Sequence, residues 1–288
     1  MPADAQWVFS AMPGERAELR HARWELETQP WGAHLLRASV RGGGRVLDIF
    51  YLSPLSNGAS TPVRGGVPVL FPQFNELGTL PKHGLARTAR WIESAPHVAD
   101  ADRDAHRSFR LHLGPDRHAG WPHTADLCFS VRGSANRLEL SLDVRNSGSS
   151  SFDWTGGLHP YFAVDDICGC SLEGLQGAPF VARGEVGPVA QAERCVEWSG
   201  ALVERLYHCA RTVSLYTPSH RLQLSMSGFN EWMVWNPGRA LAASLSDLPT
   251  EHWQRFVCVE PVCVSQPVRL RPGDRFSGSL SMTVEGLV

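Results

Sequence analysis

Apolar and polar residues alternate along several short stretches of the chain. Four stretches show the pattern, at residues 108–113, 137–144, 221–226 and 279–284. Strict alternation of this kind is typical of a β-strand that buries one of its faces. Shorter apolar runs at 67–71 and 256–259 predict strands that are more fully buried.

Turn-forming residues separate these stretches, and helical patterns are scarce. Glycine, proline and asparagine gather at 42–44, 146–148, 237–238 and 272–273, where they favour connections between strands. Residues 248–254 are expected to form one short helix at most, with Asp247 as its cap. The pattern predicts an all-β fold, a large antiparallel β-sandwich of two packed sheets, with a closed barrel as the structural alternative.

The strand pattern continues from about residue 33 to residue 285. No linker interrupts it, since the most polar segment, 96–107, is short, and no repeat of fixed period occurs. We therefore expect residues 1–288 to form a single domain.

Composition and charge narrow the class of protein. The 288 residues are 43% hydrophobic and 19% charged, which is typical of a folded chain. With 27 basic and 29 acidic residues, the chain lacks the basic surplus that favours nucleic acid or an anionic membrane. No apolar run is long enough to span a bilayer, and residues 1–19 lack the pattern of a signal peptide. We expect no nucleic-acid and no membrane partner, and the oligomeric state stays open.

Seven cysteines are scattered along the chain, and no C-x-x-C pair occurs. Neither the odd number nor the spacing suits a disulfide framework. We therefore predict free thiols and a reducing, cytoplasmic compartment.

The first segment with candidate chemistry covers residues 64–90. A loop rich in glycine and proline presents Lys82, His83 and Arg87. Together with Arg64 at the start, these residues concentrate positive charge, and a guanidinium fork suits a phosphate group. Alternatively, the cations are ordinary loop charges or pair with Glu76.

His159 and Glu260 mark two further segments. His159 lies in the apolar, aromatic stretch 154–164, where a hydrogen-bonded core histidine is the common alternative to a proton-transfer group. Glu260 follows the apolar run 256–259 and precedes a proline, and a carboxylate among apolar neighbours is either salt-bridged or functional. A histidine and a carboxylate on separate strands are candidates for one acid and one base across a substrate.

Other clusters carry weaker signals. His208-Cys209 lacks the motif of a thiol or serine nucleophile. Histidines crowd the region 97–123 without the tight spacing, cysteines and carboxylates of a metal site, so we expect no metal there; they are His97, His106, His112, His118 and His123.

Taken jointly, these segments resemble the aldose 1-epimerase superfamily, in its D-hexose-6-phosphate mutarotase branch. The motifs follow the family's order: RGGVPVLFP and LPKHGLAR within 64–87, GLHPYFAV at 157–164 and FVCVEP at 256–261, with support from ERLY at 204–207 and VWNP at 234–237. The resemblance implies a β-sandwich of the galactose-mutarotase type. It also implies an isomerase that acts on a small-molecule hexose phosphate and uses no cofactor and no metal.

The resemblance implies a role for each matching residue. His159 corresponds to the general acid that protonates the ring oxygen, and Glu260 to the general base that takes the proton from the anomeric hydroxyl. Ring opening, rotation about C1–C2 and reclosure would interconvert the α and β anomers of a hexose 6-phosphate such as glucose 6-phosphate. The matches to substrate-binding positions are Arg64, Lys82, His83, Arg87 and Glu204.

Some residues depart from the family's pattern and bear on substrate identity. Gly157 stands where alanine is expected, and Glu204 replaces the commoner aspartate. A mutarotase for free hexoses is therefore one alternative, although an uncharged sugar would not need the cationic loop. A non-catalytic sugar-phosphate binding protein is another, although a pure binder would not need both His159 and Glu260.

Overall fold

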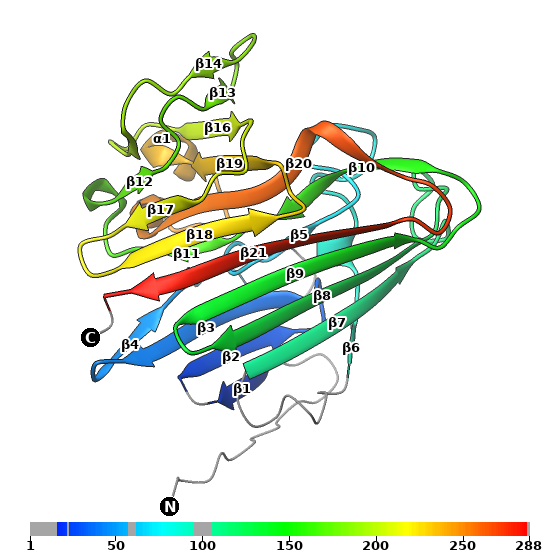
Figure 1. Cartoon of the computed structure of the whole chain (residues 1–288), viewed down its shortest axis with the longest axis horizontal. Coiled ribbons are helices and arrows are strands. Elements are labelled where there is room, and N and C mark those ends of the chain that lie inside the picture. The colour runs from blue at the N-terminus through cyan, green and yellow to red at the C-terminus, as the bar shows by residue number, and fades with distance from the viewer. Residues whose placement is uncertain (1–15, 22, 57–61, 95–104, 287–288) are drawn as a thin grey trace, which may run out of the picture.

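The computed structural model of the chain describes residues 16–21, 23–56, 62–94 and 105–286. Their strands form three antiparallel sheets of four, eight and nine strands (Figure 1). The predicted all-β class and antiparallel pairing are confirmed, and a separate four-stranded sheet is an addition that the pattern did not predict.

The four-stranded sheet follows chain order: β1 (Ala17–His21), β2 (Trp24–Gln29), β3 (His34–Gly42) and β4 (Arg45–Asp48). The predicted turn at 42–44 joins β3 to β4, and both Gly43 and Gly44 adopt positive φ. Isolated bridges, including Leu35 to Val67, connect this sheet to the region of the eight-stranded sheet.

The eight-stranded sheet draws strands from distant parts of the chain. Its order is β14 (Val189–Ala190), β13 (Pro179–Ala182), β16 (Val203–Tyr207), β19 (Glu231–Asn236), β20 (Phe256–Leu270), β10 (Phe152–Leu158) and β5 (Val69–Leu70), with β11 (Tyr161–Ala163) also paired to β20. Three of the motif segments, 64–87, 157–164 and 256–261, therefore meet in one sheet.

The nine-stranded sheet supplies the long strands that cross the molecule in Figure 1. Its order is β15 (Cys195–Glu197), β12 (Ser171–Glu173), β17 (Val213–Tyr216), β18 (Arg221–Ser227), β21 (Arg275–Glu285), β9 (Arg137–Asn146), β8 (Ala125–Ser134), β7 (Ala105–Leu113) and β6 (Ile92–Glu93). All four stretches with strict alternation lie in this sheet, as β7, β9, β18 and β21. Each sheet order ends at two different strands, so the barrel alternative is wrong for the described residues.

Alternation decides which face of each strand is buried. In β9 the four apolar residues from Leu138 to Val144 are 0% exposed, while their neighbours are partly or fully exposed. The burial of each such side chain stabilises the folded protein by about 1.5–3 kcal/mol. One hydrophobic cluster extends from Leu19 to Val284 and joins all three sheets; the single domain over residues 1–288 stays a prediction.

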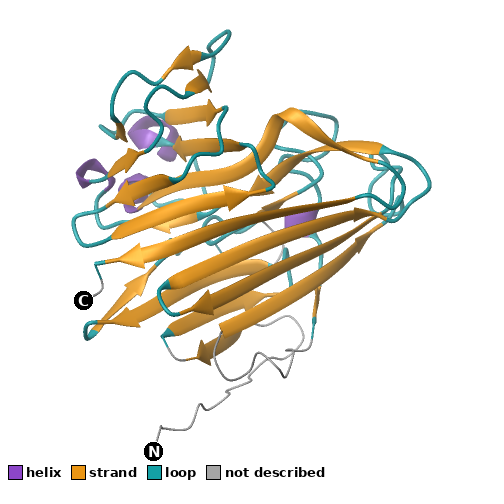
Figure 2. Cartoon of the chain, in the orientation of Figure 1, coloured by secondary structure: helices purple, strands orange, loops and turns teal. Residues whose placement is uncertain are grey.

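Helices are short and few in the described part of the chain (Figure 2). They are α1 (Gly238–Ala242) and the 3-10 helices η1 (Ala86–Thr88), η3 (Ile167–Gly169) and η4 (Thr250–Arg255). Helix η4 corresponds to the short helix predicted at 248–254, whereas α1 begins at the predicted turn 237–238. No helix among the described residues has the length and apolar content to cross a membrane.

Two local predictions are wrong. Asp247 does not cap the short helix, because Pro249 is the N-cap residue of η4 and no side chain caps it. Glu260 does not follow a strand that ends at 259, because β20 continues through Pro261 to Leu270. Glu260 is therefore held inside a long strand, which fixes its direction more firmly than a loop position would.

Candidate active site

One face of the eight-stranded sheet collects the polar groups of interest. Residues two apart on a strand share a face, so Cys258 and Glu260 of β20 point the same way. Trp235 of β19 lies opposite Cys258, and Glu204 of β16 lies opposite Trp235. On the other side, Tyr161 of β11 also pairs with Cys258. Residues from four strands thus meet on this face.

His159 enters the same face from the connection between β10 and β11. Its backbone N–H donates to the Pro68 carbonyl at 3.0 Å, and its ring stacks on Tyr161 with centroids 4.7 Å apart and planes 5° apart. Nδ1 of His159 lies 3.4 Å from Oε1 of Glu260, and the two side chains are 10% and 2% exposed. The structure thus brings these two residues, here named the His159–Glu260 pair, into contact.

Glycine at 157 is required by the close approach of neighbouring strands. Gly156 and Gly157 both have positive φ, and a Cβ at Gly157 would collide with the Pro261 carbonyl. A Cβ at Gly156 would meet the Leu70 carbonyl in the same way. Only glycine fits without strain, so the departure from alanine at 157 has a structural cause.

The His159–Glu260 pair is incompletely hydrogen-bonded. Among the described residues, Nδ1 of His159 and Oε2 of Glu260 are buried atoms without a hydrogen-bond partner. Leaving a buried polar group unpaired costs about 1–3 kcal/mol. A ligand that binds beside these two atoms would supply the missing partners.

Burial also shifts the proton affinities of the pair. It raises the pKa of Glu260 well above the usual value, and the nearby Glu204 carboxylate adds to the rise. Burial lowers the pKa of His159 well below its usual value, with smaller contributions from His83, Arg64 and Arg87. Both residues therefore favour their neutral forms, a pattern that marks functional sites more often than surface positions.

His83 is a fixed hydrogen-bond donor beside this pair. Its ring centroid is 5.5 Å from that of His159, and its Nδ1 accepts the Asn75 backbone N–H at 3.1 Å. Burial, with the charges of Arg87, Lys82 and Arg64, lowers the pKa of His83 to about 3. The neutral ring must then carry its proton on Nε2, which remains available for donation.

The two predicted arginines are close enough to influence His159, but their contacts differ. Arg64 donates from Nε to Oδ1 of Asp247 at 2.7 Å. Its acidic partner is therefore Asp247 and not Glu76, which the sequence offered as an alternative. Arg87 donates to the Lys82 carbonyl at 2.6 Å, while its Nε is buried and has no partner in the described structure. Burial is the main cause of the lowered pKa of Arg87.

Lys82 and Glu204 lie further from the centre of the site. Lys82 is exposed and acts on His83 through its charge. Glu204 is paired with Arg183 at 3.3 Å, and its carboxylate contributes to the raised pKa of Glu260. Of the five predicted residues outside the pair, four act on it through their charge, namely Arg64, His83, Arg87 and Glu204, whereas Lys82 acts on His83.

Sequence reasoning missed several residues of the site. Tyr161 and Cys258 lie inside the quoted motifs, and the two-residue spacing of Cys258 and Glu260 on a predicted strand places both on one face. The rings of Trp235 and His159 form a T-shaped contact with their centroids 6.1 Å apart. Asp247, which binds Arg64, has no local signal, since the two residues are 183 positions apart.

Metal-ligating groups come together at one place in the described part of the chain. A ring nitrogen of His159, Sγ of Cys258 and a carboxylate oxygen of Glu260 all lie within 4.8 Å of one another. Of the histidines in the region 97–123, His97 lies outside the described residues. His112 forms a hydrogen bond with Asp126 at 2.7 Å on the exposed surface, and the histidines described between 105 and 123 belong to no such group.

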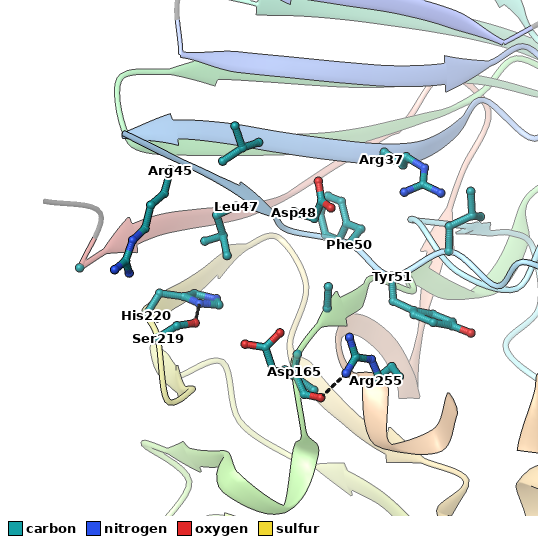
Figure 3. Close-up of a pocket in the computed structure, with 15 residues that line it drawn as sticks. Arg37, Arg45, Leu47, Asp48, Phe50, Tyr51, Asp165, Ser219, His220 and Arg255 are labelled. Carbon is teal, nitrogen blue, oxygen red and sulfur yellow. Dashed lines mark hydrogen bonds between the residues drawn. The ribbon is translucent and has the colours of Figure 1, made fainter. Parts of the chain in front are cut away.

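A separate cavity of about 430 Å³ lies between β4, the end of β11 and the turn before β18 (Figure 3). Arg45, Asp165, His220 and Arg255 are among its polar lining residues. Arg255 is committed to the Asp165 carbonyl at 2.6 Å, and His220 to Thr217 and Ser219. None of the seven predicted site residues lines this cavity. The candidate active site is therefore the region of the His159–Glu260 pair.

Comparison with known proteins shows that most of this chain is similar to proteins named as epimerases and mutarotases. The family model described as "Aldose 1-epimerase" matches residues 15–283. A protein of Escherichia coli K12 named "Putative glucose-6-phosphate 1-epimerase" is 30% identical over 240 residues, which cover 82% of this chain and 78% of that protein. One of the same name from Cenchrus ciliaris is 27% identical over 235 residues, covering 77% and 70%.

Solved structures agree in fold. The crystal structure of a "putative mutarotase" from Salmonella typhimurium superimposes with a TM-score of 0.82 at 22% identity, covering 98% of this chain and 97% of that one. A galactose mutarotase-like protein from Lactobacillus casei gives a TM-score of 0.70 at 18% identity, covering 94% and 100%. At these identities the likeness establishes the galactose-mutarotase fold, as predicted.

Proposed function

The chain belongs to the aldose 1-epimerase family, and from that premise we propose that it interconverts the α and β anomers of a D-hexose 6-phosphate. His159 is the proposed general acid and Glu260 the proposed general base. Arg64 and Arg87 are proposed to hold the phosphate. The relatives named for glucose 6-phosphate make that sugar the first substrate to test.

The observation that carries this proposal is the unsatisfied His159–Glu260 pair beside two arginines. A buried nitrogen and a buried carboxylate oxygen lack partners, and a sugar's ring oxygen and anomeric hydroxyl are groups that would supply them. Both arginines lie close enough to depress the pKa of His159. The same face therefore combines proton transfer with positive charge for a remote anion.

The proposed reaction requires only proton transfers and a bond rotation. Glu260 takes the proton from the C1 hydroxyl while His159 gives one to the ring oxygen, and the C1–O5 bond breaks. Rotation about C1–C2 then presents the other face of the aldehyde. In reclosure the proton returns from C5–OH to His159 and from Glu260 to the new anomeric oxygen, so both residues recover their starting states.

The phosphate can tune the acid as well as anchor the sugar. After ring opening, His159 is neutral and Glu260 is protonated, which are the forms that burial favours in the free site. Starting from the closed ring requires a proton on His159. A phosphate dianion that neutralises Arg64 and Arg87 removes two of the charges that lower the pKa of His159, and so favours the protonated acid.

Neighbouring residues support this assignment in distinct ways. His83, with its proton held on Nε2, is proposed to donate to the ring-oxygen side of the sugar. Lys82 and Glu204 are proposed to bind substrate at the rim. The stacked Tyr161 ring limits rotation of the His159 imidazole, which keeps the acid aligned with the reacting oxygen.

One observation favours the free-hexose alternative. Nε of Arg64 is already bound to Asp247 at 2.7 Å, so part of the positive charge is offset before any phosphate arrives. If that pair persists in the complex, Arg87 alone would provide the uncompensated guanidinium. The relative rates on phosphorylated and free sugars therefore decide between the two substrate classes.

Exchange NMR of the anomeric protons tests the function directly. Wild-type protein should accelerate α/β interconversion of glucose 6-phosphate more than that of glucose at equal concentration. Galactose and mannose 6-phosphates would define the preferred sugar. Binding of a phosphosugar without any acceleration would identify a non-catalytic binding protein instead.

The state of the cysteines bears on the compartment in which the protein acts. All seven are free thiols in the structure, including the exposed Cys168. An exposed thiol persists most readily in a reducing compartment. We therefore propose that the protein acts in the cytoplasm.

A further inference from the structure

We propose that the site also binds a zinc-class divalent cation, held by His159, Cys258 and Glu260, and that this cation competes with the sugar. The cation is an inhibitor in this proposal, because it occupies the groups that transfer protons. The inhibitory consequence rests on the proposed function, whereas the binding itself does not.

The geometry of three ligating atoms carries the proposal. The nitrogen, sulfur and oxygen atoms lie within 4.8 Å of one another and come from three buried residues. Ligands in a tetrahedral zinc site lie about 2.0–2.3 Å from the metal. Small side-chain rotations toward a common centre would bring the three atoms to those distances, leaving a fourth position for water.

The unpaired atoms provide independent support. Nδ1 of His159 and Oε2 of Glu260 are buried without hydrogen-bond partners in the described structure. A neutral imidazole and a carboxylate each offer a lone pair. A cation between them would satisfy two groups that the free protein leaves unpaired.

The donor set selects the kind of cation. Thiolate and imidazole ligands suit zinc and its softer neighbours, whereas magnesium and calcium prefer oxygen ligands alone. As the metal binds, the thiol proton of Cys258 and the carboxyl proton of Glu260 both pass to the buffer, so that a thiolate and a carboxylate supply two negative charges. These two charges balance the dication, which matters because Arg64 and Arg87 oppose an uncompensated positive charge nearby.

Cys258 is the residue that separates this proposal from ordinary substrate binding. The proposed proton transfers use His159 and Glu260 but assign nothing to the thiol. Cys258 shares their face of β20 and is 0% exposed. Cys263 lies on the same strand, is 1% exposed and takes no part in the group of ligating atoms, so it provides a matched control.

Metal binding is tested by titrating the full-length protein with Co²⁺ or Zn²⁺ up to one equivalent. Co²⁺ should give a near-ultraviolet thiolate-to-metal absorption band that Zn²⁺ displaces. Cys258→Ser should lose the band and weaken Zn²⁺ binding by at least about 100-fold, while Cys263→Ser should retain both. X-ray absorption of zinc in the wild-type protein should show one sulfur ligand at about 2.3 Å, a readout that needs no variant.

Inhibition provides the second readout. Zn²⁺ should slow the interconversion of anomers, a chelator should restore the rate, and excess phosphosugar should raise the Zn²⁺ concentration needed. Mg²⁺ should have no such effect. Equal Zn²⁺ affinity of the wild-type and Cys258→Ser proteins, or zinc without a sulfur ligand, would overturn the proposal even if the enzyme is active. Sulfur-bound zinc in a protein that never accelerates anomer exchange would instead overturn the proposed function alone.

Discussion

Two histidine–glutamate pairs lie on the eight-stranded sheet, and they differ in how far their hydrogen bonds are satisfied. In the second pair, here named the His208–Glu231 pair, Nδ1 and Oε1 are 2.7 Å apart. Glu231 also accepts the backbone N–H groups of Val264 and Ser265 at 2.7 and 2.9 Å, and the Ser265 hydroxyl. The His159–Glu260 pair has a longer contact of 3.4 Å and two buried atoms without partners.

We propose that this difference separates a structural carboxylate, Glu231, from a functional one, Glu260. Glu231 is 2% exposed and Glu260 is 1% exposed, so burial alone does not distinguish them. The distinguishing property is the set of partners, because a fully bonded carboxylate stabilises the fold while an unpaired one costs free energy until a ligand arrives. We therefore expect substitutions in the two pairs to have opposite profiles of stability and activity.

The largest expected effect is on the rate of anomer exchange. Glu260→Gln and His159→Asn remove proton transfer while keeping side-chain shape, and each should lower the rate by about 10²–10⁴-fold. Polarimetry on purified, folded protein measures it. Glu231→Gln is the matched control and should keep its rate per folded molecule. Similar losses at Glu231 and Glu260 would mean that the contrast between the pairs is false.

The second effect is on stability, and here the larger loss is expected in the His208–Glu231 pair. Glu231→Ala leaves two backbone N–H groups without an acceptor, and should lower the free energy of unfolding by about 3 kcal/mol. Glu260→Gln removes a carboxylate with few hydrogen-bond partners. It should raise the free energy of unfolding or change it by less than about 1 kcal/mol. Denaturant titration followed by circular dichroism compares them. A strongly destabilised Glu260→Gln protein would show that Glu260 is a structural residue.

The phosphate assignment predicts a selective loss at Arg87. A charge-assisted hydrogen bond contributes about 1.5–3 kcal/mol, so Arg87→Ala should weaken phosphosugar binding roughly 10- to 100-fold and barely change turnover of free glucose. Arg45→Ala, in the separate cavity of Figure 3, is the control and should have no effect on either sugar. Equal losses on both sugars would assign Arg87 to the sugar ring or to the loop.

The smallest expected effect concerns acid stability near His83. Its pKa is about 3 in the folded protein, compared with an ordinary value of 6.5, so on acidification the unfolded chain takes up the proton first. The neutral His83 therefore stabilises the fold above pH 6.5, and this stabilisation is lost as the pH falls toward 3. The free energy of unfolding should fall by about 1 kcal/mol between pH 6.5 and 5.5. His83→Asn, which tolerates the positive φ of this residue, should show a shallower loss in denaturation curves at the two pH values. Identical losses in the two proteins would contradict a buried, neutral His83.

The sequence predicted the elements whose pattern is local and repeated. Strand β9 was predictable because every second residue from Leu138 to Val144 is apolar. Helix α1 was not, because five residues are too few to show a helical period. The end of β20 was misplaced because Pro261 reads as a strand breaker, although it sits inside the strand opposite Trp232.

For the site, motif resemblance supplied the seven predicted residues, and the structure brings His159 and Glu260 into contact with His83 beside them. What sequence reasoning missed were contacts between distant residues. Asp247 was predicted to cap a helix because its local context fits one, but its partner Arg64 lies 183 residues away. The satisfied state of Glu231 depends likewise on backbone groups 33 and 34 positions further along the chain, which no local pattern reveals.

The most direct measurement is a crystal structure of the protein with bound glucose 6-phosphate. We predict that the ring oxygen and the anomeric hydroxyl fill the unpaired positions at His159 and Glu260, with the phosphate on Arg87. The predicted result is that His159 donates a hydrogen bond to the ring oxygen and that the Glu260 carboxylate accepts one from the anomeric hydroxyl. A sugar phosphate bound in the separate cavity near Arg45 and His220, with the His159–Glu260 pair still unpaired, would contradict the assignment of the site.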